Sequence, residues 1–233
     1  VHAVTLPFHG LQPLSNEERR FLVKGDISLS RDNIDLYCQP LFEALLPAVS
    51  KKRVLFLGYS LGGMMLMYLR SRLVSAALDT VFLNIGVGLV LGSTGPVIAK
   101  FWSQENFSSR RKVLQKWHHP EKIALMIDST RELTSVSSSP LFCNDPQELQ
   151  RLLAPGAKVF FVCGTNEQAY PPFESFPAVP GVSPSLPAAV SLVESDHFKY
   201  FTTAWPAVRQ VLLNVLSSQV GLSLPASPRP ASL

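Results

Sequence analysis

The chain has 233 residues, of which 46% are hydrophobic and only 16% are charged. This length and composition indicate one globular domain with a large apolar core and room for an inserted segment. The formal net charge of +4 is too small to indicate a surface that binds nucleic acid, so we expect no nucleic-acid partner.

The cysteines indicate neither a disulfide framework nor a metal site, because Cys38, Cys143 and Cys163 are odd in number and far apart. We therefore expect no metal and no cofactor. The first residues lack the basic, then apolar, then small-residue order of a secretory leader. We take the cytoplasm as the default expectation and otherwise leave the compartment open.

Short apolar runs recur along the chain, and longer polar or helical segments separate them. Continuous runs of this kind are typical of strands that are buried on both faces of a parallel sheet. Their alternation with helical segments predicts an α/β fold, with a mostly parallel central sheet flanked by helices. The runs are residues 4–6, 54–57, 81–85, 159–163 and 190–193.

Two amphipathic helices are predicted between and after these runs. Asp32 can cap a helix that extends to about residue 49, with a kink or interruption at Pro40. A closing helix follows the last run, because apolar residues repeat there at spacings of three and four. The residues expected to face inward are Ile34, Leu41, Leu45 and Leu46 in the first helix, and Phe201, Trp205, Val208, Leu212 and Val215 in the closing helix.

Residues 86–155 are too many for one crossover between strands and contain helical stretches of their own, so we expect a helical lid inserted above the sheet. Residues 80–99 carry no charged side chain, which raises the possibility of a membrane span. Asn84 and several glycines instead favour a buried strand followed by an apolar loop. Residues 217–233 are rich in serine and proline and predict a disordered tail after a domain of residues 1–216.

A basic cluster falls within the expected lid. It is balanced in part by Glu105 and Glu121, so a solvated helix face is the favoured interpretation, and peripheral contact with an anionic membrane is the alternative. The cluster consists of Arg110, Arg111, Lys112, Lys116 and Lys122.

The sequence Gly58-Tyr59-Ser60-Leu61-Gly62-Gly63 connects an apolar run to a helix-forming stretch. This G-x-S-x-G pattern predicts a sharp turn that holds the Ser60 hydroxyl clear of the sheet. The helix that follows points its free N–H groups toward the serine, and the N–H of Leu61 is the expected donor to an oxyanion. A phosphate-binding loop would need a lysine after the glycines, and the sequence has none there.

A serine hydroxyl needs a base to take its proton and a third group to orient that base. His197 follows the last apolar run, where the carboxyl end of a strand brings it to the same sheet edge as Ser60. Glu167 follows the preceding run and is the favoured acid. Asp196 is the rival, although it is adjacent to His197 in the chain and has difficulty reaching back to that ring. Two weaker alternatives are Asp128 in the lid and Asn166.

These segments resemble the α/β-hydrolase superfamily over residues 1–216, with the lid matched only loosely. The resemblance rests on the Ser60 turn, the segment 164–167, the segment 196–198 and their order of serine, acid and histidine. It implies Ser60 as nucleophile, His197 as base and Glu167 as acid, although aspartate is commoner in the last role. A serine nucleophile argues against members that use aspartate to open epoxides or remove halogen.

The superfamily also supplies a second oxyanion donor from a loop after its third strand, usually marked by His-Gly. His9-Gly10 matches that pattern, and Gly10 and Leu11 would then complete the oxyanion hole of a minimal hydrolase. The favoured assignment places residues 4–10 in the family's next segment, with Thr5 and Phe8 as departures from it. Under this assignment we expect the sequence to be a piece of a longer chain whose first three strands precede residue 1.

The sequence therefore predicts a serine hydrolase that cleaves a carboxylic ester, such as a lipid, a small ester or a thioester, through an acyl-enzyme on Ser60. Two alternatives stay open. One is a hydrolase-like binding or assembly module without activity, and the other is a membrane-associated interaction protein.

Overall fold

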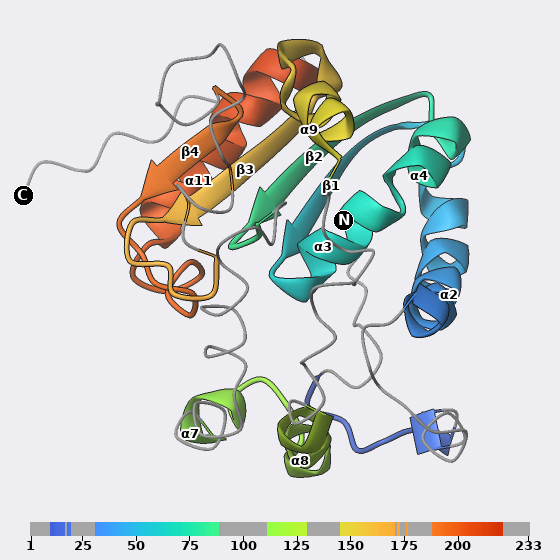
Figure 1. Cartoon of the computed structure of the whole chain (residues 1–233), viewed down its shortest axis with the longest axis vertical. Coiled ribbons are helices and arrows are strands. Elements are labelled where there is room, and N and C mark those ends of the chain that lie inside the picture. Colours follow the sequence, from blue (N-terminus) through green and yellow to red (C-terminus); the bar gives the residue numbers. More distant parts are fainter. Residues whose placement is uncertain are drawn as a thin grey trace, which may run out of the picture.

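A parallel sheet of four strands forms the centre of the molecule (Figure 1). The strands follow one another in sequence order across the sheet, and all neighbouring pairs are parallel. They are β1 (Arg53–Tyr59), β2 (Asp79–Ile85), β3 (Val159–Gly164) and β4 (Val190–Val193). The computed structural model describes residues 10–16, 18–19, 31–88, 111–129, 145–170, 172, 176 and 188–220.

Four of the five predicted apolar runs lie in these strands, and the run at residues 4–6 lies outside the described residues. The central strands β2 and β3 are buried along most of their length, as continuous apolar runs require. The predicted α/β class with a parallel sheet is confirmed. The register aligns Tyr59 with Ile85, Ile85 with Val162, and Gly164 with Val193. The carboxyl ends of all four strands therefore meet at one edge of the sheet.

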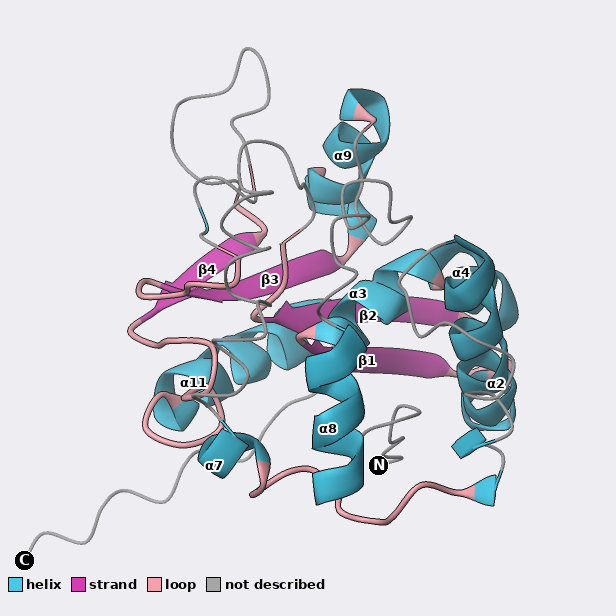
Figure 2. Cartoon of the chain, turned by 60° about the horizontal axis from the view of Figure 1, so that its bottom comes forward, coloured by secondary structure: helices cyan, strands magenta, loops and turns pink. Residues whose placement is uncertain are grey.

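Helices cover both faces of the sheet, as Figure 2 shows. One face packs against α2, α3, α4 and α9 through a core that includes Phe56, Phe82 and Phe161. The other face packs against α11 through Val208 and Val215. The helices are α2 (Arg31–Val49), α3 (Leu61–Tyr68), α4 (Arg70–Ala76), α7 (Arg111–Leu114), α8 (Pro120–Ser129), α9 (Pro146–Leu153) and α11 (Trp205–Val215), with a short η3 (Pro155–Ala157) and η4 (Leu216–Val220).

The first predicted helix is present as α2, and it runs through Pro40 without interruption. The expectation that Leu46 faces inward is wrong, because Leu46 is exposed. The buried stripe consists of positions three or four residues apart, and Leu46 lies one residue beyond Leu45 and so about 100° around the helix from it. The side chain of Ile34 lies outside the described residues. The stripe is formed by Cys38, Leu41, Leu45 and Val49.

The predicted closing helix is present as α11, with Val208 fully buried against the sheet. The inward placement of Phe201 and Trp205 is wrong, because both residues are exposed. Phe201 precedes the helix, and Trp205 is its first residue. The chain also stays helical through η4, up to Val220. The first residues assigned to the tail therefore continue the domain.

The described part of the segment 86–155 contains α7, α8 and α9. Two ion pairs join residues 18–19 to α8, Arg19 with Glu121 at 2.7 Å and Glu18 with Lys122 at 3.1 Å. Lys122 is only 4% exposed, so the interpretation of the basic cluster as a solvated face is wrong at this residue. A buried ammonium needs a carboxylate partner, which Glu18 provides. Among the described residues, no helix is both long enough and apolar enough to cross a membrane.

We predict that Phe161→Ala lowers the free energy of unfolding by about 3–5 kcal/mol, because Phe161 is fully buried in β3 and its ring lies 4.9 Å from that of Phe176. Leu192→Ala on the neighbouring strand is the control. Leu192 is 41% exposed, so its truncation should cost less than about 1 kcal/mol. Urea unfolding of both variants checks this, and equal losses would contradict the assigned core.

Candidate active site

The turn after β1 holds Ser60 in a conformation that few residues adopt, with φ at 49° and ψ at −128°. The Ser60 N–H donates to the carbonyl of Ile85 at 2.9 Å, which ties the turn to the end of β2. The turn is tight because a Cβ atom on Gly58 would lie 2.4 Å from the Cα of Gly63. Strand and helix can approach this closely only where side chains are missing. Glycine is therefore needed at both positions.

The helix α3 begins directly after Ser60, at Leu61. The Ser60 carbonyl already accepts the N–H groups of Gly63 and Met64. In the first turn of a helix no preceding carbonyl reaches the leading N–H groups, so they remain able to bind an anion. Leu61, the predicted oxyanion donor, occupies this position.

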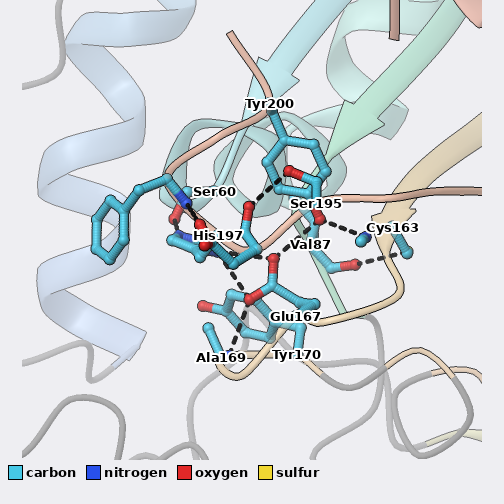
Figure 3. Close-up of polar contacts among 12 residues, drawn as sticks. Ser60, Val87, Cys163, Glu167, Ala169, Tyr170, Ser195, His197 and Tyr200 are labelled. Carbon is cyan, nitrogen blue, oxygen red and sulfur yellow. Dashed lines mark hydrogen bonds and ion pairs between the residues drawn. The ribbon is translucent and has the colours of Figure 1, made fainter. Parts of the chain in front are cut away.

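The structure brings together the three side chains that the sequence singled out (Figure 3). The Oγ atom of Ser60 lies 2.9 Å from Nε2 of His197. The Nδ1 atom of the same ring lies 3.1 Å and 3.0 Å from Oε1 and Oε2 of Glu167. The side chains come from the ends of β1, β3 and β4, which the parallel register places at one edge of the sheet.

Glu167 is only 5% exposed, and burial alone would raise the pKa of its carboxyl. The facing imidazole and three hydrogen bonds outweigh burial, so the pKa lies below its ordinary value. The donors are the Ala169 N–H at 2.9 Å, the Tyr200 hydroxyl at 2.9 Å and the His197 ring. Glu167 is therefore ionised at neutral pH.

The ionised carboxylate determines the tautomer of His197. A carboxylate can only accept hydrogen bonds, so Nδ1 of His197 carries the proton that it donates to Glu167. In the neutral ring Nε2 is then unprotonated and accepts the hydrogen bond from the Ser60 hydroxyl. A ring in this state can take the serine proton.

The rival acids lie elsewhere. The Asp196 carboxylate accepts the Phe198 N–H at 3.0 Å and pairs with Lys199 at 2.7 Å. Asp196 therefore stabilises the turn in which it lies, and Glu167 occupies the position beside the imidazole. Asn166 is exposed, and the side chain of Asp128 in α8 lies outside the described residues.

Two tyrosines form hydrogen bonds within the site, and no local sequence motif marks either of them. The Tyr59 hydroxyl donates to the backbone carbonyl of His197, and its ring stacks on the imidazole with 5.5 Å between centroids. The Tyr200 hydroxyl binds Glu167. Their position beside Ser60 and shortly after His197 was the available signal, but an aromatic residue at such a position has many other uses.

The structure contradicts the assignment of the Gly10 N–H to an oxyanion hole. The Gly10 N–H donates to Nδ1 of His118 at 3.2 Å, and its carbonyl accepts the N–H of His119 at 2.8 Å. This backbone is thus bound to the turn between α7 and α8, and its N–H is not available to an oxyanion. The side chains of the described residues form no cluster of histidine, cysteine and carboxylate ligands for a metal ion.

Comparison with known proteins gives little further information. The chain matches no known family model, and none of the curated proteins matches it. Among solved structures it is similar to MGS-M2, an α/β hydrolase enzyme from a Medee basin deep-sea metagenome library. The two share 12% sequence identity over 84% of this chain and 73% of that chain, with a TM-score of 0.47. At this level of likeness the site rests on its own geometry.

We predict that Gly58→Ala lowers the free energy of unfolding by about 1–3 kcal/mol, because the new methyl group collides with the backbone of Gly63. Gly156→Ala is the matched control, because a Cβ atom there meets nothing within 4 Å. Its effect should stay within about 0.5 kcal/mol. Chemical denaturation measures both, and a neutral Gly58→Ala would show that β1 and α3 are not in contact.

We also predict a pH signature of Glu167. Its pKa in the folded chain is lowered from 4.5, so the unfolded chain binds this proton at a higher pH than the folded chain does. The stabilisation is complete above the unfolded value and is lost as the pH falls through the folded value. Between about pH 5 and pH 3, the free energy of unfolding should fall more steeply for the wild type than for Glu167→Gln.

Urea unfolding across this pH range measures the difference. Glu148→Gln is the control, since Glu148 is exposed on α9, and its curve should run parallel to that of the wild type. Parallel curves for the wild type and Glu167→Gln would contradict an ionised, stabilised Glu167.

Proposed function

We propose that this protein is a serine hydrolase that cleaves a carboxylic ester through an acyl-enzyme on Ser60. The observation that carries the proposal is the hydrogen bond of 2.9 Å between Ser60 Oγ and His197 Nε2, on a ring whose other nitrogen is held by Glu167. A serine hydroxyl becomes a competent nucleophile when a base in this tautomer accepts its proton.

In the first half-reaction, Ser60 Oγ attacks the carbonyl carbon of the ester while its proton passes to Nε2 of His197. The negative charge of Glu167 stabilises the imidazolium that forms, and the N–H of Leu61 donates to the oxyanion of the tetrahedral intermediate. The intermediate collapses when the bond to the leaving alcohol or thiol breaks and that group takes the proton from His197.

In the second half-reaction, His197 takes a proton from water, and the resulting hydroxide oxygen attacks the acyl carbon on Ser60. The ester bond to Ser60 breaks, its oxygen recovers a proton from His197, and a carboxylic acid leaves. Each half-reaction returns His197 to its starting state. The substrate class extends to lipid esters, small esters and thioesters, since this chemistry is the same for all three.

A second candidate function is a binding or assembly module with the same fold and no activity. The observation in its favour is the Gly10 N–H, which binds His118 and so cannot serve as an oxyanion donor. A serine–histidine pair that lacks full oxyanion stabilisation loses about two to three orders of magnitude in rate.

We predict that a fluorophosphonate probe labels Ser60 covalently in the full chain, as peptide mass spectrometry would show. Ser60→Ala should abolish the labelling, and His197→Ala should slow it at least about a hundredfold, because no base remains to take the proton. Ser75→Ala is the matched control, because Ser75 lies on α4 and its hydroxyl donates to the carbonyl of Ser71.

Hydrolysis of p-nitrophenyl esters of increasing acyl length then separates small esters from long-chain lipid esters. A folded chain whose Ser60 is not labelled would overturn the hydrolase proposal and favour the binding module.

A further inference from the structure

We propose that Tyr200 is a positioning residue of this site, whose hydroxyl holds the Glu167 carboxylate in the plane and orientation that His197 requires. The inference rests on the proposed function and deepens it. The Tyr200 hydroxyl binds Gly164 and Glu167, so we expect it to act on the site through Glu167.

The Tyr200 hydroxyl is part of a directed chain of hydrogen bonds (Figure 3). Its oxygen accepts the N–H of Gly164 at 2.6 Å, and its own proton goes to Oε2 of Glu167 at 2.9 Å. Because the backbone N–H of Gly164 can only donate, the phenol proton is directed toward the carboxylate. Tyr200 is 0% exposed, so little water competes for either bond.

Two glycines in the surrounding backbone leave room for these hydrogen-bonded side chains. Gly86 has a φ of 61°, and a Cβ atom there would lie 2.8 Å from Cε2 of Tyr200 and 3.5 Å from Oε2 of Glu167. A Cβ atom on Gly164 would lie 2.2 Å from the carbonyl oxygen of Ser195 and 3.1 Å from the Tyr200 hydroxyl. Because neither glycine has a side chain, the ends of β2 and β3 can lie close to Tyr200 and Glu167.

A glutamate needs such a support more than an aspartate would. Its side chain has one more rotatable bond, so more orientations of the carboxylate are open to it. The Ala169 N–H fixes Oε1 at 2.9 Å, and Tyr200 fixes Oε2. These two donors lie on opposite oxygens, so together they define the plane of the carboxylate that faces Nδ1 of His197.

Removal of the Tyr200 hydroxyl has two expected effects. The carboxylate loses one of the donors that orient it, which slows proton transfer from Ser60. The negative charge of Glu167 is no longer shared with the Tyr200 hydroxyl, so it interacts more strongly with His197 and stabilises the protonated ring. The titratable and charged groups around this pair are Tyr59, Cys163, Asp196 and Lys199.

The test is the pH dependence of fluorophosphonate labelling of the full chain, measured as the maximal inactivation rate and the half-saturating probe concentration. In Tyr200→Phe we expect the maximal rate to fall about tenfold, the value of one charge-assisted hydrogen bond, with the half-saturating concentration unchanged. The midpoint of the acid limb should move to higher pH. Tyr68→Phe is the matched control, because it removes a tyrosine–carboxylate hydrogen bond of 2.7 Å to Asp35, on α2.

A second variant tests the same bond without removing it. Replacing Tyr200 with 3,5-difluorotyrosine gives a more acidic phenol that donates more strongly, so the midpoint should move to lower pH. Each variant and the wild type are measured at temperatures equally far below their own midpoints of thermal unfolding.

An unmoved midpoint in both variants overturns the proposal even where the rate falls, because lost packing lowers the rate without redistributing the charge. A wild-type chain that is not labelled at Ser60 would instead overturn the hydrolase proposal, and the positioning role with it.

Discussion

The imidazole of His197 is bound on both of its nitrogens, and the arrangement of the surrounding elements follows from this constraint. One nitrogen faces Ser60, and the other faces a carboxylate whose pKa burial alone would raise. His197 is only 4% exposed, so its partners lie within the fold, after the ends of strands. The parallel register provides this, because it brings the ends of β1, β3 and β4 to one edge of the sheet.

Backbone contacts without side chains make this convergence possible. Gly58 and Gly63 let β1 and α3 meet at the strained Ser60, while Gly86 and Gly164 leave space for Glu167 and its support. Strain in a turn and an ionised buried carboxylate both cost free energy of folding. The core on the two faces of the sheet must offset that cost.

Much of this arrangement could be predicted from the sequence. Continuous apolar runs identified the strands, and the positions of Ser60, Glu167 and His197 after those runs predicted their meeting. The errors have physical causes. Leu46 is apolar but lies outside the buried stripe of its helix, and Trp205 is the exposed first residue of α11. Lys122 is charged but buried because a distant Glu18 pairs with it. The role of Tyr200 depends on contacts with Gly164 and Glu167 across the fold, which no local pattern reports.

The most direct test of this account is nitrogen-15 NMR of the full chain with labelled histidine at neutral pH. The chain has five histidines, and comparison with His197→Ala assigns the signals of His197. We predict that its Nδ1 carries a proton shifted far downfield by the carboxylate and that its Nε2 is unprotonated. A proton on Nε2 with an unprotonated Nδ1 would contradict it, because that ring could not accept the proton of Ser60.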